Sequence, residues 1–119
     1  NTYLLGSREI AVIDPGPHST QHLNSILTAL LPGQRITHIF VTHSHIDHLG
    51  MAPWLCSNHR TLLHGTALTA QISEMMWYDC HKVSSIEGYP LAWDKRDIDT
   101  AIDAWRVHDF DASWEHEDW

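Results

Sequence analysis

Short β-type runs alternate with stretches of helical periodicity along the first half of the chain. Residues 2–5 and 9–13 are two such runs separated by a Gly-Ser pair, which predicts a hairpin. Apolar residues then recur at helical spacing and predict a helix over 20–31, ended by a Pro-Gly pair. The β-branched, apolar run 36–42 predicts a further strand.

The second half predicts three more helical segments and two more strands. We expect a short helix over 49–55, a strand over 60–64, a loop over 81–95, a helix over 97–105 and a strand over 106–108. A longer helix follows the strand that ends at residue 64, and the apolar residues expected to face inward on it are Leu68, Ile72, Met75 and Met76. The element order β-β-α-β-α-β-α predicts a layered α/β fold in one domain, residues 1–119.

Composition narrows the classes of function. Apolar residues make up 43% and charged residues 18%, an ordinary globular mixture. The sequence has no run of the roughly 18 apolar residues that a membrane span needs, so we expect no membrane partner. The formal charge of −8 disfavours a broad nucleic-acid interface. Cys56 and Cys80 are interpreted as reduced thiols, which favours a cytoplasmic location.

Polar side chains with metal-binding chemistry gather directly after the predicted strand 36–42. Residues 42–50 read THSHIDHLG, and the four candidate ligands there are His43, His45, Asp47 and His48. In an extended segment His43 and His45 point to the same side, so their imidazoles can converge on one cation. Asp47 and His48 follow where the chain turns into a helix, and they can reach a second cation. Imidazole with carboxylate favours zinc, iron or manganese.

This motif resembles the His-x-His-x-Asp-His signature of the metallo-β-lactamase-fold hydrolases. NTYLLG followed by AVIDPG is similar to the opening hairpin of that superfamily, with Asp14 as its first aspartate. The match covers about residues 1–55. It implies an αββα sandwich with the metal site at one edge.

The resemblance also implies roles for the matched residues. His43 and His45 would bind the first metal ion, Asp47 and His48 would bind the second, and Asp14 would hold the histidine loop in place. The two ions would be zinc, with iron or manganese as alternatives. A metal-bound hydroxide would be the nucleophile, and Asp47 could orient it.

The remaining ligands of the family pattern are not evident in this sequence. The pattern is completed by a later histidine in a Gly-His-rich turn, and no such turn follows. His108 follows a predicted strand and is the preferred further ligand, with His116 as an alternative. We therefore expect the N-terminal half of a longer domain, completed by another segment or a second copy. The chain begins with Asn1 in a predicted strand, so it gives no information about export.

Three functions follow from the resemblance. The first is a dinuclear zinc hydrolase of an ester, thioester, lactone or phosphodiester. The second is a β-CASP-type metallo-nuclease acting on RNA or DNA, because residues 46–100 are similar in order to that branch. The third is a metal-binding or interaction module without catalysis, because the downstream ligands are missing.

Overall fold

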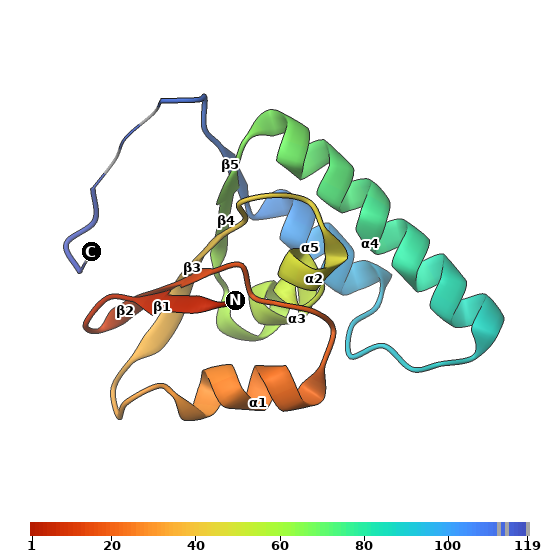
Figure 1. Ribbon diagram of the computed structural model, residues 1–119, viewed down its shortest axis with the longest axis horizontal. Coiled ribbons are helices and arrows are strands. Elements are labelled where there is room, and N and C mark those ends of the chain that lie inside the picture. The colour runs from red at the N-terminus through yellow and green to blue at the C-terminus, as the bar shows by residue number, and fades with distance from the viewer. Residues whose placement is uncertain (112, 114, 119) are drawn as a thin grey trace.

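The chain folds into a five-stranded sheet with five helices in the computed structural model, which describes residues 1–111, 113 and 115–118 (Figure 1). The strands are β1 (Tyr3–Leu5), β2 (Glu9–Ile13), β3 (Arg35–Phe40), β4 (Leu62–Gly65) and β5 (Trp105–Val107). The helices are α1 (Thr20–Thr28), α2 (Ile46–Leu49), α3 (Ala52–His59), α4 (Ala67–Glu87) and α5 (Lys95–Asp103).

The strands lie side by side in sequence order. β1 pairs with β2 antiparallel, and β2, β3, β4 and β5 run parallel. Parallel neighbours need crossover connections, and helices supply them here. The carboxyl ends of these four strands therefore meet at one edge of the sheet, where open α/β sheets bind their ligands.

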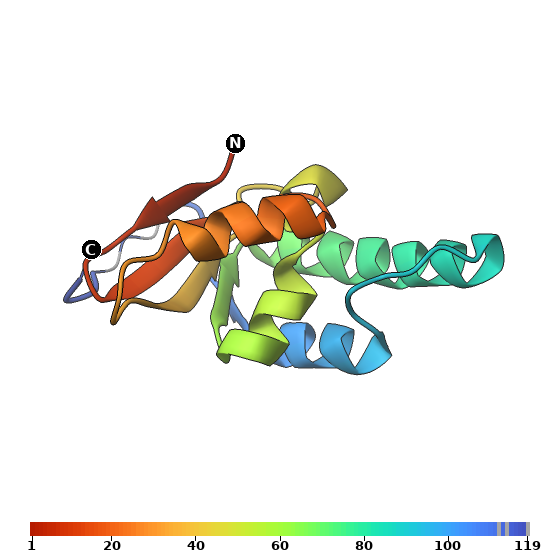
Figure 2. The same ribbon diagram turned by 90° about the horizontal axis from the view of Figure 1, so that it is seen from below.

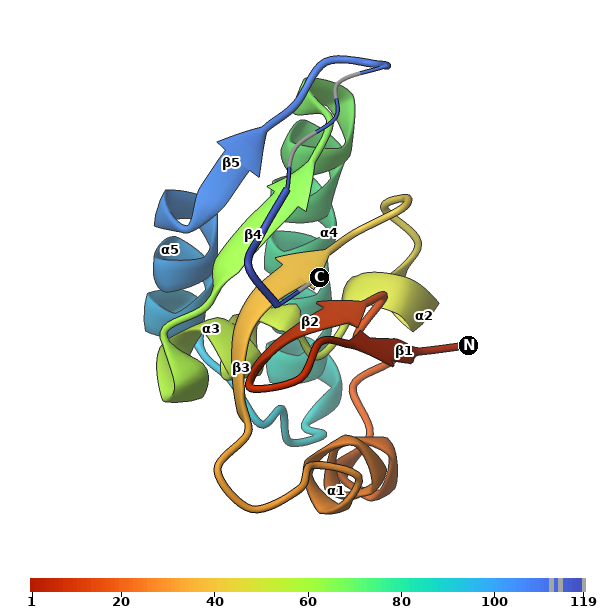
Figure 3. The same cartoon turned by 90° about the vertical axis from the view of Figure 1, so that its left-hand side faces the viewer.

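Helices cover only one face of the sheet. Figure 3 shows α3, α4 and α5 behind the sheet, α1 below it, and the C-terminal segment in front of it. The strand residues in the core include Val12, Ile39 and Leu63, which are adjacent in the register and fully buried. A single sheet with helices on one face is one half of a four-layer αββα sandwich. The size of this chain fits the N-terminal half of such a domain.

Two indole groups fix the short helix α2, which carries part of the histidine motif. Trp77 Nε1 donates to the Leu49 carbonyl at 3.1 Å, and Trp93 Nε1 donates to the Gly50 carbonyl at 2.8 Å. Both tryptophans are buried. They satisfy carbonyls that a helix end leaves without an intrahelical partner, and they hold α2 against the core.

The prediction of a loop over 81–95 is wrong for residues 81–87. Helix α4 continues through this region to Glu87 and ends at Gly88, which has a φ of 77°. Helix α5 begins at Lys95, because Asp94 and Asp97 form a capping box at its amino end.

The inward orientation predicted for Leu68 and Met75 is also wrong. Their exposed fractions are 63% and 68%, whereas Trp77 on the same helix is fully buried. Figure 2 shows that α4 extends well beyond the sheet, so only part of its length has a core to contact. The region of the predicted helix 49–55 contains parts of two helices, α2 and α3.

Within the described residues, no helix is long and apolar enough to span a bilayer.

Candidate metal centre

Asp14 is the centre of a hydrogen-bond network at the carboxyl ends of β2 and β3. It follows β2 directly, is only 6% exposed, and has a φ of 51°, a conformation that aspartate tolerates better than most residues. Its backbone N–H donates to the Phe40 carbonyl at 2.8 Å. Its carboxylate accepts the Thr42 backbone N–H at 2.9 Å and the Thr42 hydroxyl at 2.7 Å. Asp14, at the end of β2, therefore fixes the start of the histidine loop that follows β3.

The same network defines the protonation of two histidines. His48 Nδ1 lies 3.0 Å from Asp14 Oδ2, and His43 Nδ1 lies 2.9 Å from Thr42 Oγ1. An ionised carboxylate only accepts hydrogen bonds, so His48 Nδ1 carries a proton and donates it. The Thr42 hydroxyl donates to Asp14, so its oxygen accepts from His43 Nδ1–H. With Nδ1 as the donor, the neutral form of each ring has its Nε2 lone pair left for a metal ion.

Three candidate ligands come together in space. Ligand-capable atoms of Asp14, His43 and His48 all lie within 4.8 Å of one another. The ring centroids of His43 and His48 are 4.0 Å apart, and those of His43 and His45 are 5.8 Å apart. Two imidazoles with a carboxylate suit zinc, iron or manganese, so the donor set fits the ion that the motif predicts.

His45 and Asp47 lie outside this group. His45 is the exposed N-cap residue of α2, and Asp47 is exposed in the first turn of that helix. The turn into α2 brings His48 towards Asp14. The structure therefore pairs His43 with His48, and it does not form the two separate pairs that the motif predicts.

Close backbone contacts lock the loop against the segment after β2. Gly16 N–H donates to the His48 carbonyl at 3.1 Å, and the Gly16 carbonyl accepts Met51 N–H at 3.1 Å. A Cβ atom at Gly50 would lie 2.7 Å from the backbone nitrogen of His18. Glycine is required there because the two segments approach too closely for any side chain.

His108 belongs to a different cluster, on the face of the sheet opposite the helices. Its Nε2 lies 2.8 Å from His64 Nδ1, and its backbone N–H donates to the Gly65 carbonyl at 2.9 Å. The pKa of His64 is lowered to about 4, chiefly by burial and also by the neighbouring His38, His108 and Arg106. Within the described residues, His108 is not part of the Asp14, His43 and His48 group. Sequence reasoning gave His64 no role, although its place at the end of a predicted strand was a usable signal.

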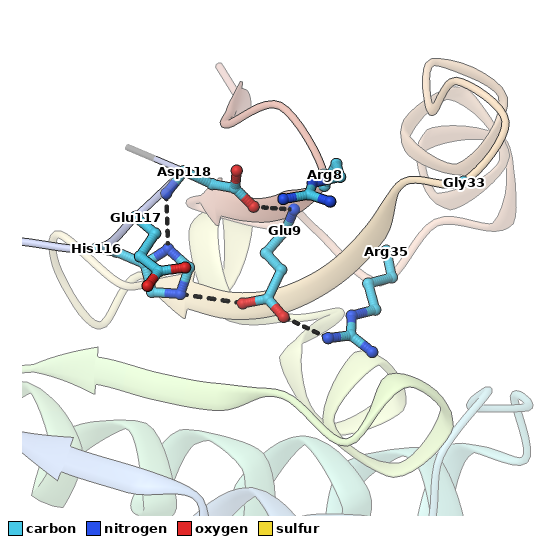
Figure 4. A pocket seen from close by; sticks show the side chains of 7 residues that line it. All are labelled: Arg8, Glu9, Gly33, Arg35, His116, Glu117 and Asp118. Carbon is cyan, nitrogen blue, oxygen red and sulfur yellow. Dashed lines mark hydrogen bonds and ion pairs between the residues drawn. The ribbon is translucent and has the colours of Figure 1, made fainter.

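A second group of possible ligands lies where the C-terminal segment meets β2. Ligand-capable atoms of Glu9, His116 and Asp118 lie within 4.8 Å of one another, beside a cavity of about 430 Å³ (Figure 4). Glu9 forms ion pairs with His116 Nε2 at 3.0 Å and with Arg35. Asp118 accepts the Glu9 backbone N–H and the Ser7 hydroxyl, each at 2.7 Å.

The donors of this second group are already used in contacts that hold the C-terminal segment to the hairpin. The Arg35 hydrogen bond is the main cause of a lowered Glu9 pKa, and the Ser7 hydrogen bond is the main cause of a lowered Asp118 pKa. A positive guanidinium beside the carboxylate also opposes a cation. We therefore interpret the group as a structural contact. Sequence reasoning proposed His116 but missed Glu9 and Asp118, whose meeting depends on a contact spanning more than 100 residues.

Comparison with known proteins supports the family that the histidine motif resembles. The model of the metallo-beta-lactamase superfamily matches residues 1–118. Transcription termination factor FttA of Lokiarchaeum sp. (strain GC14_75) is 31% identical over 77 residues, which are 64% of this chain and 12% of that protein.

Two solved structures match parts of this chain, and the first is similar in fold. A beta-lactamase domain protein from Burkholderia ambifaria is 20% identical, with a TM-score of 0.65, over 97% of this chain and 39% of that one. ETHE1 from Myxococcus xanthus is 28% identical, with a TM-score of 0.45, over 56% of this chain and 30% of that one. The chain thus spans well under half the length of each of these three proteins.

Proposed function

We propose a metal-dependent hydrolytic function for this chain, which belongs to the metallo-beta-lactamase superfamily. The observation that carries the proposal is the hydrogen-bond chain from Asp14 through Thr42 to His43, together with the bond from His48 to Asp14. With Nδ1 as the donor in both contacts, both Nε2 atoms would be acceptors, which is the state that a metal ion requires. Zinc is the ion we expect, and two ions are expected in the complete site.

The residues of this chain would then have distinct roles. His43 and His48 would bind through Nε2, and His45 could join them if the exposed loop turns inward. Asp14 would orient His48 directly and His43 through Thr42. A bound divalent ion supplies Lewis acidity and lowers the pKa of water at the site. Asp47 would accept a proton from the attacking water and keep it in line with a carbonyl or phosphoryl group.

The substrate class proposed is an ester, thioester, lactone or phosphodiester. The three donors grouped here are fewer than a two-ion site needs, so we propose that a further segment or a second copy supplies the rest. His108 would join the site only after moving away from His64. We also propose a cytoplasmic location, which is supported by two cysteines that form no disulfide with each other.

Metal content and turnover test this proposal together. Elemental analysis of the purified chain should find zinc, and hydrolysis of p-nitrophenyl acetate and bis(p-nitrophenyl) phosphate should depend on it. Asp47→Ala should lower turnover by about 100-fold or more, since a general base contributes 10²–10⁴-fold. Zinc affinity should stay close to that of the unmodified chain. Unchanged turnover in this variant would show that Asp47 is not the general base.

A metallo-nuclease is the second candidate, and one observation favours it. The relative with 31% identity is by name a transcription termination factor. A labelled single-stranded RNA incubated with the zinc-loaded chain distinguishes the two, because only the nuclease cleaves it. A chain that binds zinc but turns over neither the esters nor the RNA would instead be a non-catalytic metal-binding module.

A further inference from the structure

An open groove lies at the amino end of the parallel strands, between helices α3 and α5. Its volume is about 560 Å³, and its lining includes Arg60, Arg96 and Arg106. Arg60 is the C-cap residue of α3, Arg96 lies in the first turn of α5, and Arg106 lies in β5. We call this feature the arginine groove.

The arginine groove is separate from the candidate metal centre. Asp14 and His43 follow the carboxyl ends of β2 and β3, whereas Arg60 directly precedes Thr61 and the start of β4. β3 and β4 are parallel, and His38 near the middle of β3 pairs with Leu62 at the start of β4. The groove therefore lies towards the opposite edge of the sheet, and a ligand there would not compete for the metal ligands.

The groove concentrates positive charge in an acidic chain. It holds three of the seven Lys and Arg residues of a chain whose formal charge is −8. All three arginines are exposed, and none takes part in the ion pairs found among the described residues. Arg106 is steadied by a bond from its guanidinium to the Trp105 carbonyl at 2.9 Å.

Two aspartates also line the groove, but one is already engaged. Asp97 Oδ2 accepts the Asp94 backbone N–H at 2.8 Å as part of the capping box of α5. Asp103 is the other, at the end of the same helix. Three guanidinium groups against these two carboxylates leave the groove net positive.

A buried hydroxyl on the groove lining has no partner in the described part of the chain. Ser57 Oγ is inaccessible to solvent and forms no hydrogen bond there. Buried polar atoms are normally hydrogen-bonded, so an unsatisfied one needs an explanation. Because this hydroxyl is inaccessible to solvent, it is not a contact for a ligand in the open groove.

We propose that the arginine groove binds the phosphate group of a small phosphorylated molecule. Guanidinium is the group best matched to phosphate, because its planar fork of N–H donors forms two parallel bonds to the oxygens. The volume lies within the 300–1,000 Å³ typical of small-molecule sites. A long polyanion is disfavoured, because it would leave the groove and meet a surface of net negative charge.

The test is a titration of the ¹⁵N-labelled chain with inorganic phosphate, followed by NMR. Saturable shifts are expected at residues 57, 60–61, 96 and 106, with little change at Asp14, His43 and His48. Arg96→Gln should weaken binding by about tenfold, since a hydrogen bond to a charged group is worth about that factor. Lys95→Gln is the matched control. It removes one positive charge at the neighbouring position, and the Lys95 side chain does not line the groove.

Three results would overturn the proposal. One is no saturable binding, or shifts confined to Asp14, His43 and His48, which would place phosphate at the metal ligands instead. Another is equal weakening by Arg96→Gln and Lys95→Gln, which would mean attraction to general charge. The third is tight binding of a single-stranded oligonucleotide through the groove with no binding of phosphate, which would show a nucleic-acid surface. None of these results depends on zinc or on hydrolysis.

Discussion

Among the residues that the structure describes, two groups of metal-capable side chains lie on this sheet, and the core positions only the first. The first joins Asp14, His43 and His48 at the ends of adjacent parallel strands. The second joins Glu9, His116 and Asp118, where the C-terminal segment meets β2. Both combine imidazole and carboxylate within the same distance limit.

The two groups differ in how they use their hydrogen bonds. In the first, the Asp14 carboxylate accepts from the Thr42 hydroxyl and lies beside His48 Nδ1, and the Thr42 oxygen lies beside His43 Nδ1. With Nδ1 as the donor, the Nε2 atoms of both imidazoles are left as acceptors. In the second, the carboxylates bind an arginine, a serine and a backbone N–H, and both histidine nitrogens are engaged. Proximity of donors is therefore insufficient evidence for a metal site, because the state of the lone pairs decides whether a cation can bind.

The largest difference between the two groups should appear in the free energy of unfolding when the buried carboxylate of Asp14 is removed. Asp14→Ala should lower the free energy of unfolding by about 3 kcal/mol, because the buried carboxylate joins two donors of Thr42 and one histidine, and all three lose their partner. Urea unfolding measures this change. Asp14→Asn is the matched control, since asparagine tolerates the positive φ and keeps an acceptor. A Glu9→Ala loss as large as that of Asp14→Ala would contradict the contrast between the two groups.

The second largest difference between the two groups should appear in zinc affinity. His43→Ala and His48→Ala should each weaken zinc binding by about 100-fold, at the upper end of what changes in a metal site cost. His116→Ala should leave the affinity unchanged. Calorimetric titration of the three variants makes the comparison, and a His116→Ala loss equal to that of His48→Ala would place the ion in the second group.

A smaller effect should reveal the hydrogen-bond chain itself. Thr42→Val keeps the shape of the side chain but removes the hydroxyl between His43 and Asp14. Zinc affinity should fall by about tenfold, as expected for a residue that orients a ligand. The same calorimetry measures it, with the exposed Thr28→Val as a control for the substitution. An unchanged affinity would mean that the tautomer of His43 is not set by Thr42.

The smallest effect concerns the acid sensitivity of the second group. The pKa values of Glu9 and Asp118 are lowered in the folded chain, chiefly by Arg35 and Ser7 respectively. Carboxylates with lowered pKa values stabilise the folded contact above their unfolded pKa of about 4, and the contribution is lost as the pH falls through the folded value. The contact of residues 115–118 with the hairpin should therefore open below pH 4.

The amide chemical shift of Glu9 reports this opening, because its N–H is donated to Asp118. Asp118→Asn should give the shift of the open form already at neutral pH. A Glu9 amide that shows no transition down to pH 3 would contradict a contact held by these carboxylates.

Local sequence signals were sufficient for the strands and for most helix starts. The hairpin of β1 and β2, the strand β3 and the helix α1 were predicted from β-branched runs, helical spacing and caps, all set by neighbouring residues. The extent of α4 was not predictable in the same way. Its exposed apolar residues include Leu68 in the first turn and Met75, and its buried side includes Thr69 and Ser73 as well as Trp77.

The sequence by itself determined that the donors follow strands, and therefore that they gather at the carboxyl edge of a parallel sheet. That conclusion requires only chain order and strand direction. Only the tertiary structure decided which donors meet. The Asp14–His48 contact spans 34 residues, and α2, held by two indoles, turns His48 inward while His45 and Asp47 remain exposed. Spacing fixes the direction of neighbouring side chains along a strand or helix, but only packing fixes how two segments meet.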